Sequence, residues 1–193
     1  MKRNALYVSL LVVAIAAAGF AFYVARRPTV IERPVLGAPP VPQPPPPPQA
    51  LVGHEAPAFS GVDINGQTID SSQLRGRVIV LNIWATWCGP CVEEMPRIER
   101  EIWQRFRPDV QVVAAAASED VTKVAAFNRR MKLTFPLIAD EHREIASLYG
   151  GRDVLPRIYV IDRTNHIVHQ TRGYGEEEFA GVIAAVERAV GAR

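Results

Sequence analysis

The chain has 193 residues, and its 22 Lys and Arg against 20 Asp and Glu give a net charge of +2. The basic surplus lies in the first 50 residues, where Glu32 is the only acid. The rest of the chain is therefore slightly acidic and offers no basic face for phosphates, which excludes nucleic-acid binding. The length allows one domain of ordinary size with additional segments.

The chain begins with an apolar segment. Residues 5–25 carry no charge and are long enough to cross a bilayer, with two basic residues on each side. We interpret residues 1–27 as a short cytoplasmic tip and a transmembrane anchor. Positive charge on both flanks leaves the orientation undecided. The alternative is a signal peptide, either retained or cleaved near residues 16–18.

A proline-rich segment follows at residues 28–50, which contain ten prolines in 23 positions. This composition favours extended polyproline II structure over a packed fold. We interpret the segment as a spacer that could reach ~70 Å at ~3.1 Å per residue. A disordered tether and a proline-rich ligand for a partner domain are the alternatives.

Residues 51–193 are predicted to form a single α/β core. The core opens with a hairpin, because short strands at 59–63 and 67–69 flank Asn65-Gly66, a strong turn signal. Residues 78–84 form a β-branched apolar run that is typical of a strand buried on both faces.

A helix is predicted directly after this strand. Pro90 falls in its first turn, where the missing N–H costs nothing, whereas Pro96 lies inside the pattern and predicts a kink. A further strand is predicted at 110–116, and Ser118 is predicted to cap a helix that runs to about Arg130. The apolar stripe of the first helix recurs at three- and four-residue steps and consists of Val92, Met95, Ile98, Ile102 and Phe106.

The last part of the core is predicted to add three strands and two helices. A short strand at 136–139 precedes a short helix at 141–149, and residues 157–162 and 167–170 form a hairpin. A final helix follows an acidic first turn at 176–178. Its apolar face consists of Phe179, Val182, Ile183, Val186 and Val190.

Both cysteines of the chain lie in the segment Trp87-Cys88-Gly89-Pro90-Cys91, so any sulfur chemistry is confined to one pair. At a strand-to-helix junction, unsatisfied N–H groups and the positive end of the helix dipole stabilise the thiolate of the first cysteine. Cys88 is therefore predicted to be the attacking sulfur. Cys91 lies one turn inside the helix, where its anion is less favoured.

The order of elements resembles the thioredoxin fold, and the likeness is greatest to the membrane-anchored TlpA and ResA group of thiol–disulfide oxidoreductases. The resemblance covers about residues 51–193 and rests on segments 52–59 and 81–96 and on Leu155-Pro156. It implies a central mixed sheet with helices on both faces, an N-terminal β-hairpin and a small strand–helix insertion at 135–149.

The resemblance also implies roles for the motif. Cys88 would attack a substrate disulfide as nucleophile and Cys91 would resolve the mixed disulfide, in a dithiol–disulfide cycle that needs no other cofactor. Gly89 and Pro90 match the reducing members of the fold. Thioredoxin-like proteins place a cis proline opposite the cysteines, so Pro156 is predicted to be cis, although an unselected X-Pro bond is trans.

Four further residues near the motif are candidates for supporting roles. Trp87 would either offer an apolar contact to a partner protein or simply pack. Glu93 and Glu94 are predicted to stabilise the helix dipole from its first turn, with a proton relay as the alternative for Glu94. Asn82 stands where thioredoxin has a buried Asp, so proton transfer for Cys91 would depend on water or on Glu94.

The partners implied by the resemblance are protein thiols and disulfides, with a transmembrane thiol carrier as electron donor. The implied location is the bacterial inner membrane, with a single span and the catalytic domain on the periplasmic side. Cytochrome c biogenesis is one candidate process, and apocytochrome c thiols, copper-site cysteines and general periplasmic disulfides are candidate substrates. Leu155 and Arg157 depart from the polar residues that many relatives have beside the proline, which leaves the substrate unidentified.

Two other functions and a structural metal site are the alternatives for the cysteine pair. A peroxiredoxin-like thiol peroxidase would carry Pro-x-x-x-Thr/Ser-x-x-Cys, but Leu81 and Ala85 occupy those positions before Cys88. A copper-binding or metallochaperone module is disfavoured because copper-delivering relatives have three residues between their cysteines. Structural zinc is not predicted either, since no second C-x-x-C exists to complete four ligands.

Overall fold

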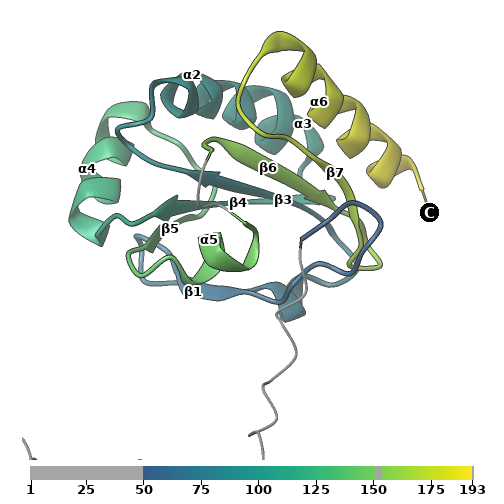
Figure 1. Cartoon of the computed structure of the whole chain (residues 1–193), viewed down its shortest axis with the longest axis horizontal. Helices are drawn as coiled ribbons and strands as arrows, with labels where there is room; N and C mark the ends of the chain where they lie inside the picture. The colour runs from purple at the N-terminus through teal and green to yellow at the C-terminus, as the bar shows by residue number, and fades with distance from the viewer. Residues whose placement is uncertain (1–49, 151–153, 193) are drawn as a thin grey trace, which may run out of the picture. The chain divides into compact units, whose positions relative to one another are not determined.

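The domain is built on a five-stranded mixed sheet (Figure 1). A computed structural model describes residues 50–150 and 154–192 of the chain, so the predicted anchor and all of the proline-rich segment except Ala50 lie outside the described residues. Strands β3, β4 and β5 are parallel, whereas β6 is antiparallel to β3 and β7 is antiparallel to β6. In sheet order the strands are β5 (Leu137–Asp140), β4 (Val110–Ala117), β3 (Val78–Trp84), β6 (Arg157–Ile161) and β7 (Ile167–Gln170).

The central strand β3 has all seven of its residues buried, as its β-branched apolar sequence predicted. Side chains alternate between the two faces of a strand, so β3 contributes to two separate cores. Val78, Val80 and Trp84 belong to one core, and Ile79, Leu81 and Ile83 belong to the other. The loop that carries Cys88 follows this strand, which is buried on both faces and paired with β4 and β6.

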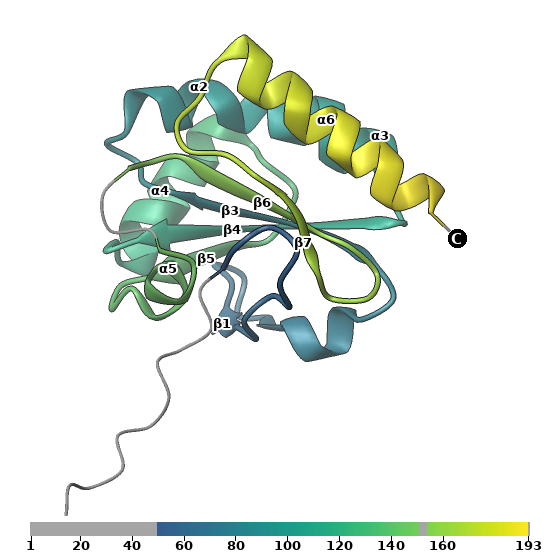
Figure 2. The same cartoon turned by 45° about the vertical axis from the view of Figure 1, so that its right-hand side comes forward.

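One face of the sheet is covered by three helical segments (Figure 2). The first begins as α2 (Gly89–Arg97), continues through a π-helical stretch (Ile98–Trp103) and ends as α3 (Gln104–Phe106). The second is α4 (Val121–Met131) and the third is α6 (Glu176–Gly191). The predicted apolar face of the last helix is confirmed, because Phe179, Val182 and Val186 are buried in this core.

The other face is covered by the short helix α5 (Glu144–Leu148), the hairpin β1 (Ser60–Val62) and β2 (Thr68–Asp70), and a 3₁₀ turn (Ser71–Leu74). The predicted turn at Asn65-Gly66 is present, with Gly66 at φ +81°. The predicted α/β architecture, with a mixed sheet between helices and an N-terminal hairpin, is confirmed. Within the described part of the chain no helix combines the length and apolar character that a membrane span requires.

Two local predictions need correction, the Ser118 cap and the extent of α5. Ser118 does not cap the second helix; it has a left-handed φ of 62°, and Asp120 accepts the Lys123 N–H at 3.0 Å instead. Near Pro96, where a kink is predicted, the helix passes from α to π hydrogen bonding at Ile98. Helix α5 is shorter than predicted, because the chain turns through a left-handed Arg143 before the helix begins.

Candidate active site

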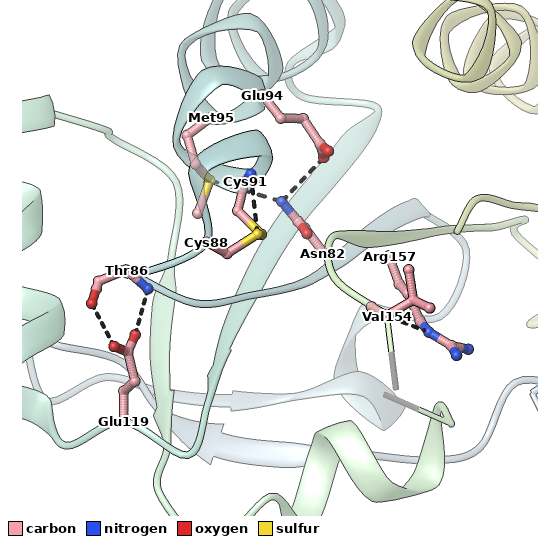
Figure 3. The surroundings of a disulfide bond; sticks show 9 residues. All are labelled: Asn82, Thr86, Cys88, Cys91, Glu94, Met95, Glu119, Val154 and Arg157. Atoms are coloured by element: carbon pink, nitrogen blue, oxygen red, sulfur yellow. Dashed lines mark hydrogen bonds between the residues drawn. A yellow bond between two sulfur atoms is a disulfide. The ribbon is translucent and has the colours of Figure 1, made fainter. Parts of the chain in front are cut away.

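The N-terminus of α2 carries a disulfide between Cys88 and Cys91 (Figure 3). Cys88 is the N-cap residue of the helix, with extended backbone angles, and its Sγ accepts a hydrogen bond from the Cys91 N–H at 3.3 Å. This contact uses one of the N–H groups that a helix leaves unpaired at its start. The sequence-based expectation that Cys88 lies at the positive end of a helix agrees with this geometry.

The two sulfur-bearing residues differ in their access to solvent. Cys88 is 7% exposed, whereas Cys91 is fully buried. Gly89 and Pro90 lie between them in the exposed first turn, and Pro90 is at a position where no N–H is needed. A partner that approaches the disulfide therefore reaches Cys88 and not Cys91.

Trp87 is the most exposed large apolar residue near the pair, at 73%. Of the two uses considered for it, core packing is ruled out by this exposure. Trp84 is instead the packed tryptophan, buried with its ring 4.7 Å from that of Phe127. An exposed indole beside a reactive sulfur offers a flat apolar contact to another protein.

The Leu155–Pro156 peptide bond is cis. The strand register pairs Arg157 with Ile83, so Pro156 comes just beyond this pair, beside the end of β3 from which the motif loop leaves. Leu155 contacts both cores, and Val154 is exposed. A partly exposed segment thus lies beside the end of β3 from which the loop to Cys88 leaves.

Glu94 is buried at 1% exposure, and no acid lies in the first turn of α2, which corrects the prediction that Glu93 and Glu94 stabilise the helix dipole from there. Glu93, its neighbour, is exposed. Burial raises the pKa of Glu94 to about 8, against a smaller lowering by the positive charge of Arg97. The carboxyl group is therefore mostly protonated at neutral pH.

Asn82 lies between the disulfide and Glu94 (Figure 3). It is fully buried on β3, and its Nδ2 lies 3.4 Å from Glu94 Oε1 and 3.8 Å from Met95 Sδ. Its Oδ1 has no hydrogen-bond partner among the described residues. The structure thus places Asn82 and Glu94 beside each other near the cysteine pair.

Glu119 is a site residue that the sequence analysis missed. It is 3% exposed and accepts hydrogen bonds from the Thr86 N–H at 2.7 Å and from the Thr86 hydroxyl. These contacts tie the loop before Cys88 to the end of β4. The sequence shows only an acid within Ser118-Glu119-Asp120, and nothing in that pattern indicates that the middle residue turns inward.

The chain matches the model of the AhpC/TSA family over residues 52–170, which is more than half of its length. The chain belongs to the AhpC/TSA family. It is 34% identical over 128 residues to the thiol-disulfide oxidoreductase ResA of Bacillus thuringiensis, which covers 66% of this chain and 73% of the relative. It is 33% identical over 138 residues to ResA of Halalkalibacterium halodurans, covering 69% and 78% respectively.

Solved structures agree with these relatives. A putative protein disulfide isomerase from Bacteroides thetaiotaomicron has a TM-score of 0.69 and 35% identity, covering 74% of this chain and 91% of that one. The family member described here is thus a thiol–disulfide oxidoreductase with a thioredoxin-like fold, and its cysteine pair is the redox centre. Within the described residues no group of three or more His, Cys, Asp or Glu side chains is arranged to hold a metal ion.

Proposed function

We propose that this AhpC/TSA family member reduces disulfides of protein substrates outside the cytoplasm. The observation that supports the proposal most directly is the difference between the two cysteines. Cys88 lies at the exposed end of the helix beside Trp87, whereas Cys91 is buried behind it. The Gly-Pro pair between them, which matches reducing members of the fold, favours reduction over oxidation.

The reaction is a pair of thiol–disulfide exchanges. The Cys88 thiolate attacks one sulfur of a substrate disulfide, the substrate S–S bond breaks, and one substrate sulfur leaves as a thiolate. Cys91 then loses its proton and attacks Cys88 Sγ, which releases the second substrate thiolate and forms the Cys88–Cys91 disulfide. Two electrons and two protons from a transmembrane thiol carrier regenerate the dithiol.

Glu94 is proposed to donate a proton to the Cys91 thiolate, with Asn82 holding the carboxyl group in place. When a donor thiolate attacks Cys88, Cys91 leaves as a thiolate in a buried place that disfavours charge. Glu94 is protonated in the disulfide state and lies one turn along the same helix, so it is suited to supply the proton. The Asn82 amide lies between them and orients the carboxyl group.

The proposed location follows from the segments that precede the domain. Residues 1–27 would anchor the protein in the bacterial inner membrane, and residues 28–50 would hold the domain away from it on the periplasmic side. The TlpA and ResA group that the sequence resembles is membrane-anchored, which supports this location. Cytochrome c biogenesis remains one candidate process, because cysteine pairs of apocytochromes need such a reductant.

Insulin reduction by the purified full chain, with dithiothreitol as donor, tests the reaction. We expect the wild type to accelerate insulin precipitation and Cys88→Ser to fall to the uncatalysed rate. Cys91→Ser is the matched variant, because it keeps the attacking sulfur and should accumulate disulfide-linked insulin. Equal activity of Cys88→Ser and wild type would exclude Cys88 as the nucleophile.

Thiol-dependent removal of hydrogen peroxide separates the main alternative from this proposal. The family match keeps a peroxidase under consideration, but Ala85 stands where a peroxidase carries Thr or Ser. We expect peroxide consumption no faster than that of the dithiol donor alone. If peroxide consumption depended on Cys88 and were faster than insulin reduction, the protein would be a peroxidase and the reductase proposal would be wrong. Copper retained at one equivalent after gel filtration would favour the metallochaperone.

A further inference from the structure

A buried arginine lies on the side of the sheet opposite the cysteine pair. Arg157 is only 5% exposed, and its side chain points away from the disulfide (Figure 3). Its Nε donates to the Val154 carbonyl at 3.2 Å, and its Nη1 donates to the Tyr159 hydroxyl at 3.4 Å. Its Nη2 is buried and has no hydrogen-bond partner among the described residues.

The charge of Arg157 is not balanced by an acid in the described part of the chain. None of the ion pairs there includes it. Two neighbouring phenols cannot balance it either, because Tyr159 donates to the Tyr149 carbonyl and Tyr149 donates to the Pro57 carbonyl at 2.6 Å. Burial, and then the nearby Tyr159, raise the pKa of Tyr149, so that phenol stays neutral. A buried cation without a counter-charge is costly.

Arg157 lines a pocket of about 360 Å³ between the end of α5 and strands β6 and β7. Among the described residues that line this pocket, two are arginines, Arg157 and the exposed Arg172, and none is acidic. Gln170 and Ser147 add polar side chains to the wall. The pocket is therefore lined by a positive charge, and Nη2, which is shielded from solvent, has N–H donors without a partner among the described residues.

We propose that this pocket is a carboxylate-binding site in which the Arg157 guanidinium holds the ligand. Nη2 has N–H donors without a partner, and a carboxylate oxygen that accepted from one of them would also supply the missing negative charge. One carboxylate also matches the single buried charge, whereas a phosphate would bring more lone pairs than the pocket has donors to satisfy. The ligand is either a small free carboxylate or an acidic side chain of a partner protein.

A ligand in this pocket would affect the redox site through the backbone segment that joins Arg157 to Pro156 and Val154. Arg157 follows Pro156 directly and bonds back to the Val154 carbonyl, so its side chain fixes the segment beside the end of β3 that precedes the cysteine motif. A carboxylate bound to Arg157 would therefore hold this segment from the opposite side of the sheet. This inference does not depend on whether the pair reduces or oxidises its substrate.

Titration of the oxidised full chain in detergent micelles tests the site. Glutarate and an acetylated glutamate-containing peptide are added in separate arms at constant ionic strength, with ¹⁵N-labelled arginine observed by NMR. We expect a saturable shift of the Arg157 Nε–H resonance. Saturation by the peptide alone assigns the site to a partner protein, and saturation by glutarate assigns it to a free carboxylate. No saturable shift in either arm, or tighter binding of inorganic phosphate, would overturn the proposal.

Variants test whether binding needs the planar guanidinium group of Arg157 or only a positive charge. Arg157→Lys keeps the charge but loses the planar fork, so we expect affinity to fall about tenfold or more. Arg129→Gln removes an exposed arginine on α4 and should leave affinity unchanged. Asp153 lies outside the described residues, and a rise in affinity of about tenfold in Asp153→Asn would show that Arg157 already has a partner within the chain. That result would also overturn the proposal.

Discussion

Cys88 and Cys91 share one helical turn but not one environment. Cys88 accepts the Cys91 N–H and reaches the surface, while Cys91 is enclosed by the core. A helix N-terminus stabilises negative charge only where its N–H groups point, and here they point to Cys88. Two chemically identical thiols thus acquire separate roles from their positions along a single turn.

Alkylation of the reduced protein measures this difference. We expect iodoacetamide to label Cys88 at least about tenfold faster than Cys91 at pH 6 to 7, because thiolate character and access both favour it. Mass spectrometry of the two tryptic sites after short labelling gives the rates. Indistinguishable rates across this range would contradict the assignment of Cys88 as the attacking sulfur.

Glu94 is expected to make stability depend on pH. Its pKa is about 8 in the folded disulfide state against 4.5 in the unfolded chain, so the folded state alone holds the proton between these values. Stability must therefore fall as pH rises from about 4.5 to about 8, by about 3 to 5 kcal/mol. Glu94→Gln cannot ionise and should lose this slope.

Urea unfolding of the oxidised protein at several pH values makes the measurement. Glu93→Gln is the matched control, since Glu93 is exposed on the same turn and its variant should keep the wild-type slope. Superimposable profiles of wild type and Glu94→Gln would mean that Glu94 ionises normally. The proton role proposed for it would then fail, while the cysteine chemistry would stand.

At the scale of elements, the active site depends on a loop fastened at both ends. One end is the capped start of α2, and the other is Thr86, held by Glu119 from the end of β4. The parallel pairing of β3 and β4 brings these two strand ends to the same edge of the sheet. The sheet topology therefore places Glu119 against Thr86, which lies 33 residues earlier in the chain.

Glu119→Ala should loosen this fastening. It leaves the Thr86 N–H and hydroxyl without an acceptor, and we expect a loss of about 2 to 4 kcal/mol in the free energy of unfolding. Glu119→Gln keeps one acceptor oxygen and should lose less. Glu141→Ala changes an exposed acid near β5 and should stay within about 0.5 kcal/mol of wild type. A loss for Glu119→Ala no larger than for Glu141→Ala would refute the role of this contact.

Local sequence signals located the elements well but not the directions of single side chains. The β-branched run of β3 and the Asn65-Gly66 turn could each be predicted from the sequence, because each has a conformational preference of its own. Ser118 and Asp120 are both good cap residues, and only the inward turn of Glu119 decides between them. The burial of Glu94 could not be predicted from its own helix either, because it depends on packing against β3.

At the scale of the whole molecule, the N-terminal edge of the domain is defined by backbone pairing with the turn and start of β7. The Gly53 N–H donates to the Ile167 carbonyl at 2.8 Å, and the Ile167 N–H donates to the His54 carbonyl at 2.9 Å. The Ala56 N–H donates to the Asn165 carbonyl at 2.8 Å. The folded unit therefore includes the chain from at least Gly53 onward, and the boundary at 51 stays a prediction.

Truncation distinguishes the folded unit from the segments that precede it. A chain that starts at Pro46 keeps these three hydrogen bonds, so we expect the urea midpoint and insulin reduction of the full chain. A chain that starts at Pro57 loses all three and should lose about 2 to 4 kcal/mol of stability. The Pro46 chain should also fail to float with lipid vesicles, whereas the full chain should float. Flotation of both, or of neither, would remove residues 1–27 as the anchor and leave the redox domain unaffected.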